Sequence, residues 1–478
     1  MNKLRAVLFA AALSSLSACY GADNQVAITV YNQNFGLVKD VRTIELKDGI
    51  NYLRFDDVAA TIDPTTVSFA SLSAPNSVTV REQNYQYDLM DLGTILSKSV
   101  GKQVKFTQYL SAGGAHEVIG TLLSSPQVTV SDSNGNISTR GQSIVVKTND
   151  GVVVGPGGEL EISALPDGLV SKPSLLWKLE SDKAGPQKAE ISYQAQGLNW
   201  KCDYVAVANA DDSKVDLTSW VTLDNKSGAV YKDASLKLMA GDVHKVQNAP
   251  RPMQMMFKSA MAMSAAAPQF QEQSFAEYHL YSLNGKTTLG NNETKQLTLF
   301  NASAVPVKKL FIYDGGGAPY YGGYIPNQQP GKVNVKLELA NSKENNLGMP
   351  MPKGKVRVYK KDQDGALQFV GEDLIDHTPK DEKVRVYLGD AFDIVGERKQ
   401  TNMQQVSNRV QRMSYEIDLR NHKDSAVTVT CVEHANGDWK ILSSSQPYVK
   451  KDAHTFEFAV KVAANSESKV TYEIETRY

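Results

Sequence analysis

Cys19 and the three residues before it are the part of this chain whose types and spacing most directly suggest chemistry. Residues 16–19 read Leu-Ser-Ala-Cys. Small side chains before a cysteine let an extended peptide enter a signal peptidase, and the thiol is a nucleophile that can take up diacylglycerol. Two or more acyl chains, at about 0.8 kcal/mol per buried CH₂, hold a protein stably on a membrane. These residues predict lipidation of Cys19.

The residues before Cys19 are typical of a bacterial export signal. Lys3 and Arg5 precede an apolar run over residues 6–13, which is shorter than the ~20 residues that a membrane-spanning helix needs. In this context residues 16–19 resemble a lipobox, and residues 1–18 would be the lipoprotein signal peptide. The alternative is an ordinary secretory signal cut near Ser17 or Ala22.

Tyr20 refines the expected location of the protein. In lipoproteins of this kind an aspartate after the cysteine favours retention at the inner membrane, and here the residue is tyrosine. We therefore expect an outer-membrane lipoprotein of the bacterial cell envelope. Whether it faces the periplasm or the cell surface stays open.

Cys202 and Cys431 remain if Cys19 carries lipid. Export to an oxidising compartment makes a disulfide between them possible. Each lies in an alternating run beside large apolar neighbours, and a buried free cysteine behaves as a small hydrophobic residue. The sequence leaves both alternatives open and favours free, buried thiols.

Three tyrosines, Tyr320, Tyr321 and Tyr324, lie in a Gly/Pro/Tyr-rich segment over residues 315–331. Exposed aromatic rings there could stack on a sugar or on the surface of a partner. The alternative is a hairpin tip whose rings fold back onto the protein. They are candidate ligand contacts.

Methionines are concentrated in a second long segment, residues 247–273, which is also rich in Ala, Pro and Gln. Thioethers can bind Cu(I), a soft ion, but neither His nor Cys lies among these methionines, so a linker is the stronger interpretation. The methionines concerned are Met253, Met255, Met256, Met261 and Met263, with Met349 and Met351 later.

Acidic residues near a histidine form the last cluster that could bind a metal. They are Glu372, Asp373, Asp376, His377, Asp390 and Asp393. Neither the spacing of a helix–loop–helix calcium loop nor HExxH is present, no GxSxG motif occurs, and no SxxK motif lies in an expected helix. We therefore expect no metal site, no cofactor and no catalytic residue. An envelope hydrolase or metal-dependent enzyme with a site between domains remains the alternative.

The overall charge argues against one class of partner. The 51 basic and 52 acidic residues give a formal net charge of −1, whereas a nucleic-acid-binding protein usually has a basic excess or stripe. We therefore expect no nucleic-acid partner.

Most of the chain has the alternating pattern of antiparallel β-sheets, as in residues 26–30 and 456–462. Short strands with glycine-bearing turns over residues 101–163 favour a small closed barrel. One helix is expected over residues 88–96, with Asp88 as its cap and Gly101 closing its end. The sequence thus predicts an all-β, multi-domain protein with immunoglobulin-like sandwich units and a small N-terminal barrel.

One pattern recurs through the second half: aliphatic, any residue, Leu, any residue, Asn. Its asparagines are Asn225, Asn301, Asn341 and Asn421. The aliphatic positions would point into a core, and the asparagine would end the strand by bonding to the backbone of the turn. The pattern is typical of strand–loop–strand units in sandwiches.

Composition and turns suggest three domains after the signal peptide. These are an N-terminal β region with the barrel at 19–170, a sandwich at 171–310 with the linker inside it, and a second sandwich at 311–478.

Several segments resemble a bacterial envelope family called domain of unknown function 4139. The resemblance covers roughly the last three-fifths of the chain, in residues 197–204, 217–228, 233–243, 278–281, 353–359 and 415–421. Some relatives are labelled mucoidy inhibitor and many have a coiled-coil insert, whereas this chain has no sustained heptads. The resemblance implies β-sandwiches and an envelope location, and no catalytic residues.

These observations together lead to one expectation of function. We expect a lipid-anchored, non-catalytic envelope protein that binds or scaffolds a protein or a glycan.

Overall fold

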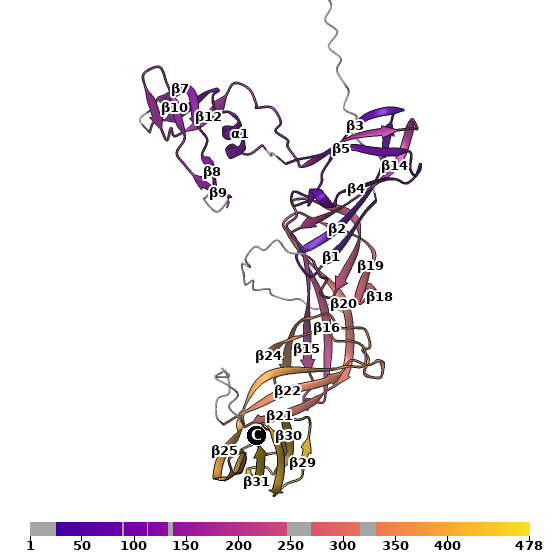
Figure 1. The fold of residues 1–478 in the computed structure, drawn as a ribbon, viewed down its shortest axis with the longest axis vertical. Coiled ribbons are helices and arrows are strands. Elements are labelled where there is room, and N and C mark those ends of the chain that lie inside the picture. The colour runs from indigo at the N-terminus through magenta and orange to yellow at the C-terminus, as the bar shows by residue number, and fades with distance from the viewer. Residues whose placement is uncertain (1–24, 88–89, 112, 132–136, 246–268, 316–330) are drawn as a thin grey trace, which may run out of the picture.

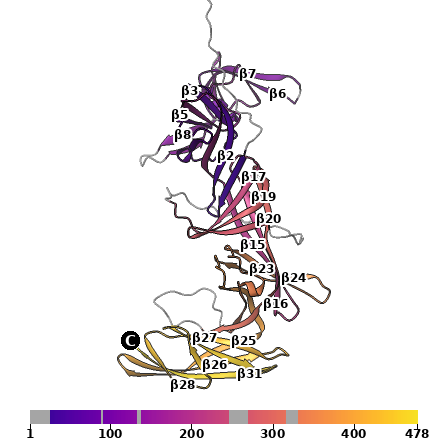
Figure 2. The ribbon, with the colours of Figure 1, turned by 90° about the vertical axis from the view of Figure 1, so that its right-hand side faces the viewer.

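The computed structural model describes residues 25–87, 90–111, 113–131, 137–245, 269–315 and 331–478. This part of the chain holds thirty-one strands, one α-helix and two short 3₁₀ helices, which confirms the all-β prediction. Most of the sheets follow one another along the long axis of the molecule, and the C-terminus lies at one end. A unit formed by residues 90–163 lies to one side at the opposite end (Figure 1; Figure 2).

A seven-stranded sheet contains the first strand of the described chain. Its order is β18 (Phe270–Phe275), β19 (Tyr278–Leu289), β17 (Tyr231–Ala240), β1 (Gln25–Tyr31), β2 (Phe35–Leu46), β14 (Gly185–Gln196) and β4 (Ser68–Ser71). Strands β1 and β17 are parallel, with Ala27 opposite Ser235, and the other pairs are antiparallel.

A three-stranded sheet packs on the β2–β14–β4 part of that sheet. It consists of β3 (Gly49–Asp56), β13 (Ser174–Ser181) and β5 (Val78–Gln86). Trp177 on β13 makes edge-to-face contacts with Phe55 and with Phe69 of β4, at ring distances of 5.8 and 5.5 Å. The two layers therefore form a sandwich, with the 3₁₀ helix η1 (Pro64–Thr66) at its side.

The central sheet has five strands and continues the same hydrophobic core. Its order is β20 (Glu293–Pro306), β16 (Lys214–Asn225), β15 (Leu198–Ala208), β23 (Gly354–Lys361) and β24 (Leu367–Ile375). Trp200 and Tyr281, whose rings contact edge to face, join this sheet to the seven-stranded one within a single core.

The C-terminal sheet has nine strands around a separate core. Its order is β28 (Asp438–Ser444), β31 (Ser466–Arg477), β26 (Val410–Asn421), β25 (Lys383–Ser407), β22 (Lys332–Ala340), β21 (Lys308–Asp314), β27 (Val427–His434), β30 (Thr455–Val462) and β29 (Tyr448–Lys450). The second 3₁₀ helix, η2 (Lys343–Asn345), follows β22.

Residues 90–163 form a small unit of their own. Its main sheet has the order β11 (Val152–Val154), β10 (Val145–Lys147), β7 (Ala115–Ser124), β6 (Gln103–Tyr109) and β12 (Glu159–Ile162), and β8 (Gln127–Ser131) pairs with β9 (Ile137–Gly141). Because β11 and β12 stay unpaired with each other in the described residues, the sheet is open and the predicted closed barrel is wrong. Short edge strands limit closure, and Leu96 of the helix packs on the core instead.

The helix of this unit, α1, spans Leu92–Lys98. The carboxylate of Asp91 accepts a hydrogen bond from the amide of Thr94 at 3.1 Å and caps its start. The predicted cap, Asp88, lies outside the described residues. Gly101 follows the end of the helix with φ +84°, a conformation that glycine adopts without steric cost.

Strands from either side of residue 170 share sheets. Strand β14 pairs with β2 and β4, and β13 pairs with β3 and β5. After residue 310 the strands also alternate between two sheets. Strands β21 and β22 belong to the C-terminal sheet, and the later strands β23 and β24 belong to the central sheet.

Three of the four recurring asparagines end their strands as predicted. Asn225 and Asn421 each accept a hydrogen bond from the amide two residues later, at 3.0 and 3.1 Å. Each donates to the carbonyl four residues later at 2.9 Å, and to a carbonyl on another loop at 2.8 Å. Asn341 donates to the carbonyls of Met349 and Pro379 and accepts from the amide of Gly348.

The fourth asparagine differs because of where its strand ends. Asn301 is exposed within β20, which continues to Pro306, so the prediction is wrong at this position. The other three asparagines are at most 1% exposed, and each one supplies hydrogen bonds that buried turn backbone would otherwise lack.

Candidate binding cleft

An open cleft of about 340 Å³ lies beside the N-terminal sandwich. This volume is within the range of small-ligand sites in proteins. The residues that line it come from three separate stretches of the chain: Ala60, Ile62, Pro64, Tyr85, Tyr87 and Pro173. None of them is charged, so the cleft fits an uncharged, largely apolar group.

One wall of the cleft is held by the turn around η1. Asp63 caps this turn by accepting from the amide of Thr65 at 3.1 Å. The amide of Asp63 donates to the carbonyl of Gln194 at 2.9 Å, and the hydroxyl oxygen of Thr66 accepts from the amide of Gln194. Because β14 fixes both ends of the turn, Pro64 is held in place at the cleft.

A second wall carries two tyrosine rings. Tyr85, on β5, and Tyr87, just after it, stack with ring centroids 5.5 Å apart. The Tyr85 hydroxyl donates to the carbonyl of Ala60 at 3.0 Å. This hydrogen bond holds the Tyr85 ring next to Ala60. Tyr87 is 65% exposed, as aromatic residues that contact a partner often are.

A third contact ties the two walls together. Gln83 donates from Nε2 to the carbonyl of Pro64 at 3.1 Å and accepts from Nε1 of Trp177 at 2.9 Å. Burial, together with the neighbouring Tyr87, raises the pKa of Tyr85. The Tyr85 hydroxyl is therefore protonated at neutral pH and stays a donor to Ala60.

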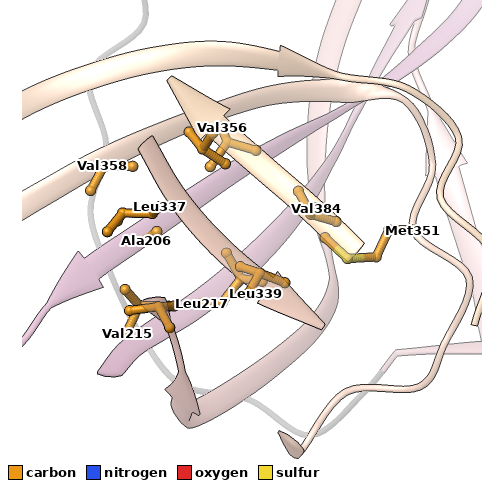
Figure 3. Close-up of a pocket in the computed structure, with 11 residues that line it drawn as sticks. Ala206, Val215, Leu217, Leu337, Leu339, Met351, Val356, Val358 and Val384 are labelled. Atoms are coloured by element: carbon orange, nitrogen blue, oxygen red, sulfur yellow. The ribbon is translucent and has the colours of Figure 1, made fainter. Parts of the chain in front are cut away.

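A second cavity, in the middle of the protein, is a packing void. It has a volume of about 10 Å³ and lies between the central sheet and strands β22 and β25 (Figure 3). Figure 3 shows that aliphatic side chains and Met351 line it. A space of this size holds at most about one water molecule, and an apolar lining gives water no partner. It therefore offers no room for a ligand.

A buried ion pair lies in the core of the C-terminal sheet. Glu433 is 1% exposed and accepts from Nε of Arg398 at 2.9 Å, while the hydroxyl of Tyr472 donates to the same carboxylate. The guanidinium stacks on the ring of Tyr415, 3.8 Å from its centroid. Burial raises the pKa of Glu433 even though Arg398 and Tyr472 oppose this rise.

Gly315 closes this ion pair from outside. A Cβ atom there would lie 2.4 Å from Oε1 of Glu433 and 2.6 Å from Cδ of Arg398. The backbone of Gly315 thus lies directly against both side chains of the pair. The pair acts as an internal brace of the C-terminal sheet.

A chain of side-chain hydrogen bonds crosses the central sheet. Gln296 donates to Thr222 at 3.2 Å, and Thr222 donates to Asp203 at 3.0 Å. Arg357 then contacts both Asp203 and Glu372, each at 3.3 Å. The five residues come from the five strands in order. This series of contacts therefore fixes the register of the whole sheet, and its polar groups satisfy one another.

One comparison with known proteins identifies the chain. Residues 189–478, which include the central and C-terminal sheets, match the domain of unknown function DUF4139. The chain belongs to this family. No curated protein matches it. All six residues that line the cleft of this DUF4139 protein precede residue 189, so the cleft lies outside the matched part.

The two cysteines of the DUF4139 region are free thiols. Both are buried, Cys202 in the core shared by the N-terminal and central sheets and Cys431 in the C-terminal core. Burial raises the pKa of Cys202 to about 12, and burial followed by the charge of Glu433 raises that of Cys431. Neither forms a bridge in the structure.

Other candidate residues are dispersed or lie outside the described part. Cys19, the methionines of 246–268 and the tyrosines Tyr320, Tyr321 and Tyr324 are outside the described residues. Met351 is buried in the core. Within the described ranges no three His, Cys, Asp or Glu side chains are placed to hold a metal ion.

Residues of the acidic cluster form ion pairs and hydrogen bonds with nearby groups. Glu372 contacts Lys355 at 2.8 Å, and Asp390 contacts Lys332 at 3.0 Å. Asp373 accepts from the amide of Tyr387 at 2.7 Å. Glu372 and Asp373 lie within β24 and Asp390 lies within β25, so these carboxylates are bound by groups on the same or neighbouring strands.

The cleft was not predicted from the sequence. Its walls come from residues 60–64, 85–87 and 173, which are distant in the chain. The available signal was weak: two tyrosines one residue apart at the end of a strand, and two prolines that each end or begin a turn. Only the pairing of β13 with β5 brings Pro173 near Tyr85.

Proposed function

We propose that this protein is a lipid-anchored, non-catalytic lipoprotein of the bacterial cell envelope, attached to the outer membrane through Cys19, that binds a partner through the cleft of Tyr85 and Tyr87. The observation that carries the binding role is the cleft itself, since it is open, holds about 340 Å³ and presents stacked aromatic rings beside two prolines.

The chemistry of the lining favours a peptide segment of a partner protein. Sugar recognition combines aromatic rings with charged or amide side chains that bond to hydroxyl groups, and the six lining residues include neither kind. Grooves of tyrosine and proline instead fit extended peptides that contain proline or other apolar residues. A glycan is the second candidate ligand.

The anchor rests on the sequence of residues 16–19. Among the described residues, no helix is long and apolar enough to cross a membrane. The alternative function, a hydrolase or metal-dependent enzyme with a site between domains, would need reactive side chains around an open space. The open cleft has no acid, base or nucleophilic cysteine in its lining.

Photocrosslinking in living cells tests the binding role. A benzophenone amino acid replaces Tyr87, and in a matched control it replaces Phe392, an aromatic residue that is 96% exposed on β25. We expect a discrete protein adduct from position 87 that is absent from position 392 and that Tyr85→Ala weakens. No adduct, or the same adducts from both positions, would count against the cleft. An adduct that glycosidases remove would identify a glycan instead.

A further inference from the structure

His377 lies where the seven-stranded sheet meets the central sheet. It follows β24, and its Nδ1 accepts a hydrogen bond from the amide of Lys353 at 3.2 Å. Its other ring nitrogen, Nε2, lies 3.4 Å from the side-chain amide of Asn32. Lys353 directly precedes β23 of the central sheet, and Asn32 lies in the turn between β1 and β2. One imidazole therefore connects the two sheets.

The hydrogen-bond partners of His377 determine which ring nitrogen carries the proton. Because Nδ1 accepts from a backbone amide, a neutral His377 carries its single proton on Nε2. That N–H needs an acceptor. The Oδ1 atom of Asn32 is buried and is without a hydrogen-bond partner among the described residues. Half a turn of the Asn32 amide brings this oxygen to Nε2, where it can accept the N–H, and moves Nδ2 to the position that the oxygen leaves.

We propose that neutral His377 is a pH-sensitive clasp between the two sheets, and that protonation of its ring opens the clasp. A proton added at Nδ1 turns that nitrogen from an acceptor into a donor. It would then face the amide N–H of Lys353, which is also a donor, so the bond between them is lost. Nε2–H keeps its bond to Asn32, and the break falls on the side of the central sheet.

Four charged or titratable groups face the ring from the surrounding elements. Lys353 and His279 disfavour a charged His377, whereas Asp242 and Asp376 favour it. Three of these are engaged with other groups: Asp242 and Nζ of Lys353 contact each other at 2.8 Å, and His279 contacts Glu272 at 2.8 Å. Burial of the ring and the charge of Lys353 lower its pKa from 6.5.

The lowered pKa of His377 sets the direction in which pH changes the strength of the clasp. A released His377 binds its proton near pH 6.5, and the clasped ring binds it only at lower pH. The clasp is therefore at full strength above pH 6.5 and weakens as the pH falls from there to the pKa of the clasped ring. Linkage makes this weakening about tenfold for each pH unit in that interval.

Hydrogen exchange of the full mature protein measures the clasp directly. The amide of Lys353 is the reporter, in peptides that cover residues 350–356, after correction for the intrinsic pH dependence of exchange. We expect its protection to fall about tenfold per pH unit below pH 6.5 in the wild type. In His377→Gln, which cannot titrate, protection should become independent of pH. Equal protection of the wild type at pH 7.5 and pH 5 would overturn the proposal, as would an unchanged pH dependence in His377→Gln.

A matched control and a spectroscopic measurement complete the test. His116 is exposed on β7, and His116→Gln should behave as the wild type. Nitrogen-15 NMR of labelled histidine in the wild type should show His377 with its proton on Nε2 and a pKa below 6.5. Asn32→Asp places a carboxylate beside Nε2, which favours the protonated ring, and should move the opening to higher pH. A proton on Nδ1 of neutral His377, or a pKa of 6.5 or higher, would refute the clasp even if every variant failed to fold.

Discussion

Arg398 donates from Nε to both carboxylate oxygens of Glu433, at 3.1 and 2.9 Å, inside the C-terminal core. Glu433 is almost fully buried, whereas about a fifth of the Arg398 side chain is exposed. A buried pair of this kind is weak proof of net stabilisation, because both charges lose hydration. Its effect is clearest when one partner is removed.

Glu433→Gln should destabilise the protein by about 3 kcal/mol, because it leaves the guanidinium of Arg398 without its counter-charge in a core. The double variant Arg398→Met with Glu433→Gln should recover part of this loss. Urea unfolding followed by tryptophan fluorescence measures both. An undiminished stability of Glu433→Gln would show that solvent reaches Arg398 well enough to replace the pair.

Asn225→Ala and Asn421→Ala should each cost about 2–3 kcal/mol, because each leaves buried turn carbonyls and an amide without partners. Asn301→Ala is the matched control from the same sequence pattern. Asn301 is exposed, and water can replace the contacts of its side chain, so its change should stay within about 0.5 kcal/mol. Equal effects at all three positions would contradict the assigned role.

The two buried thiols should be unreactive in the folded protein. The thiolate is the form that attacks a thiol reagent. Burial raises the pKa of Cys202 to about 12 and also raises that of Cys431, so both stay protonated at pH 8. We expect Cys202 and Cys431 to be unlabelled in the native state and both labelled after unfolding without reductant, as measured by mass spectrometry. Labelling that requires prior reduction would instead indicate a bridge.

Cys19→Ala should move the protein from the membrane fraction to the soluble fraction of the envelope, because no acyl chain can attach. The readout is fractionation with immunoblotting, together with the mass of the mature N-terminal peptide. Cys202→Ala is the control, since it removes a thiol without touching the signal. A soluble wild type with an unmodified N-terminus would remove the anchor from the proposed function.

Alternation of apolar and polar residues was enough to predict the all-β class, since it directly reports a strand with one buried face. The asparagine pattern also transferred well at positions 225, 341 and 421, where a local turn decides the contacts. At Asn301 the same pattern failed because β20 continues beyond it. The sequence around Asn301 resembles that around the other three asparagines, and only the strand pairing distinguishes Asn301 from them.

Long-range pairing accounts for what the sequence could not provide. The contact of His377 with Asn32 joins residues 345 positions apart, and no periodicity reports such a contact. The walls of the cleft depend on β13 pairing with β5, and the predicted barrel depended on an edge pairing that the described sheet does not make. In each case the information lies in which strands meet, and side-chain patterns within one strand do not contain it.

The parallel pairing of β1 with β17 has a consequence for how the chain is made. Strand β1 emerges early from the ribosome, but Ala27 finds its partner only when Ser235 has been synthesised. Until then one edge of the future sheet presents bare amide and carbonyl groups that other chains can pair with. Burial of this edge therefore waits until β17 is available to pair with β1.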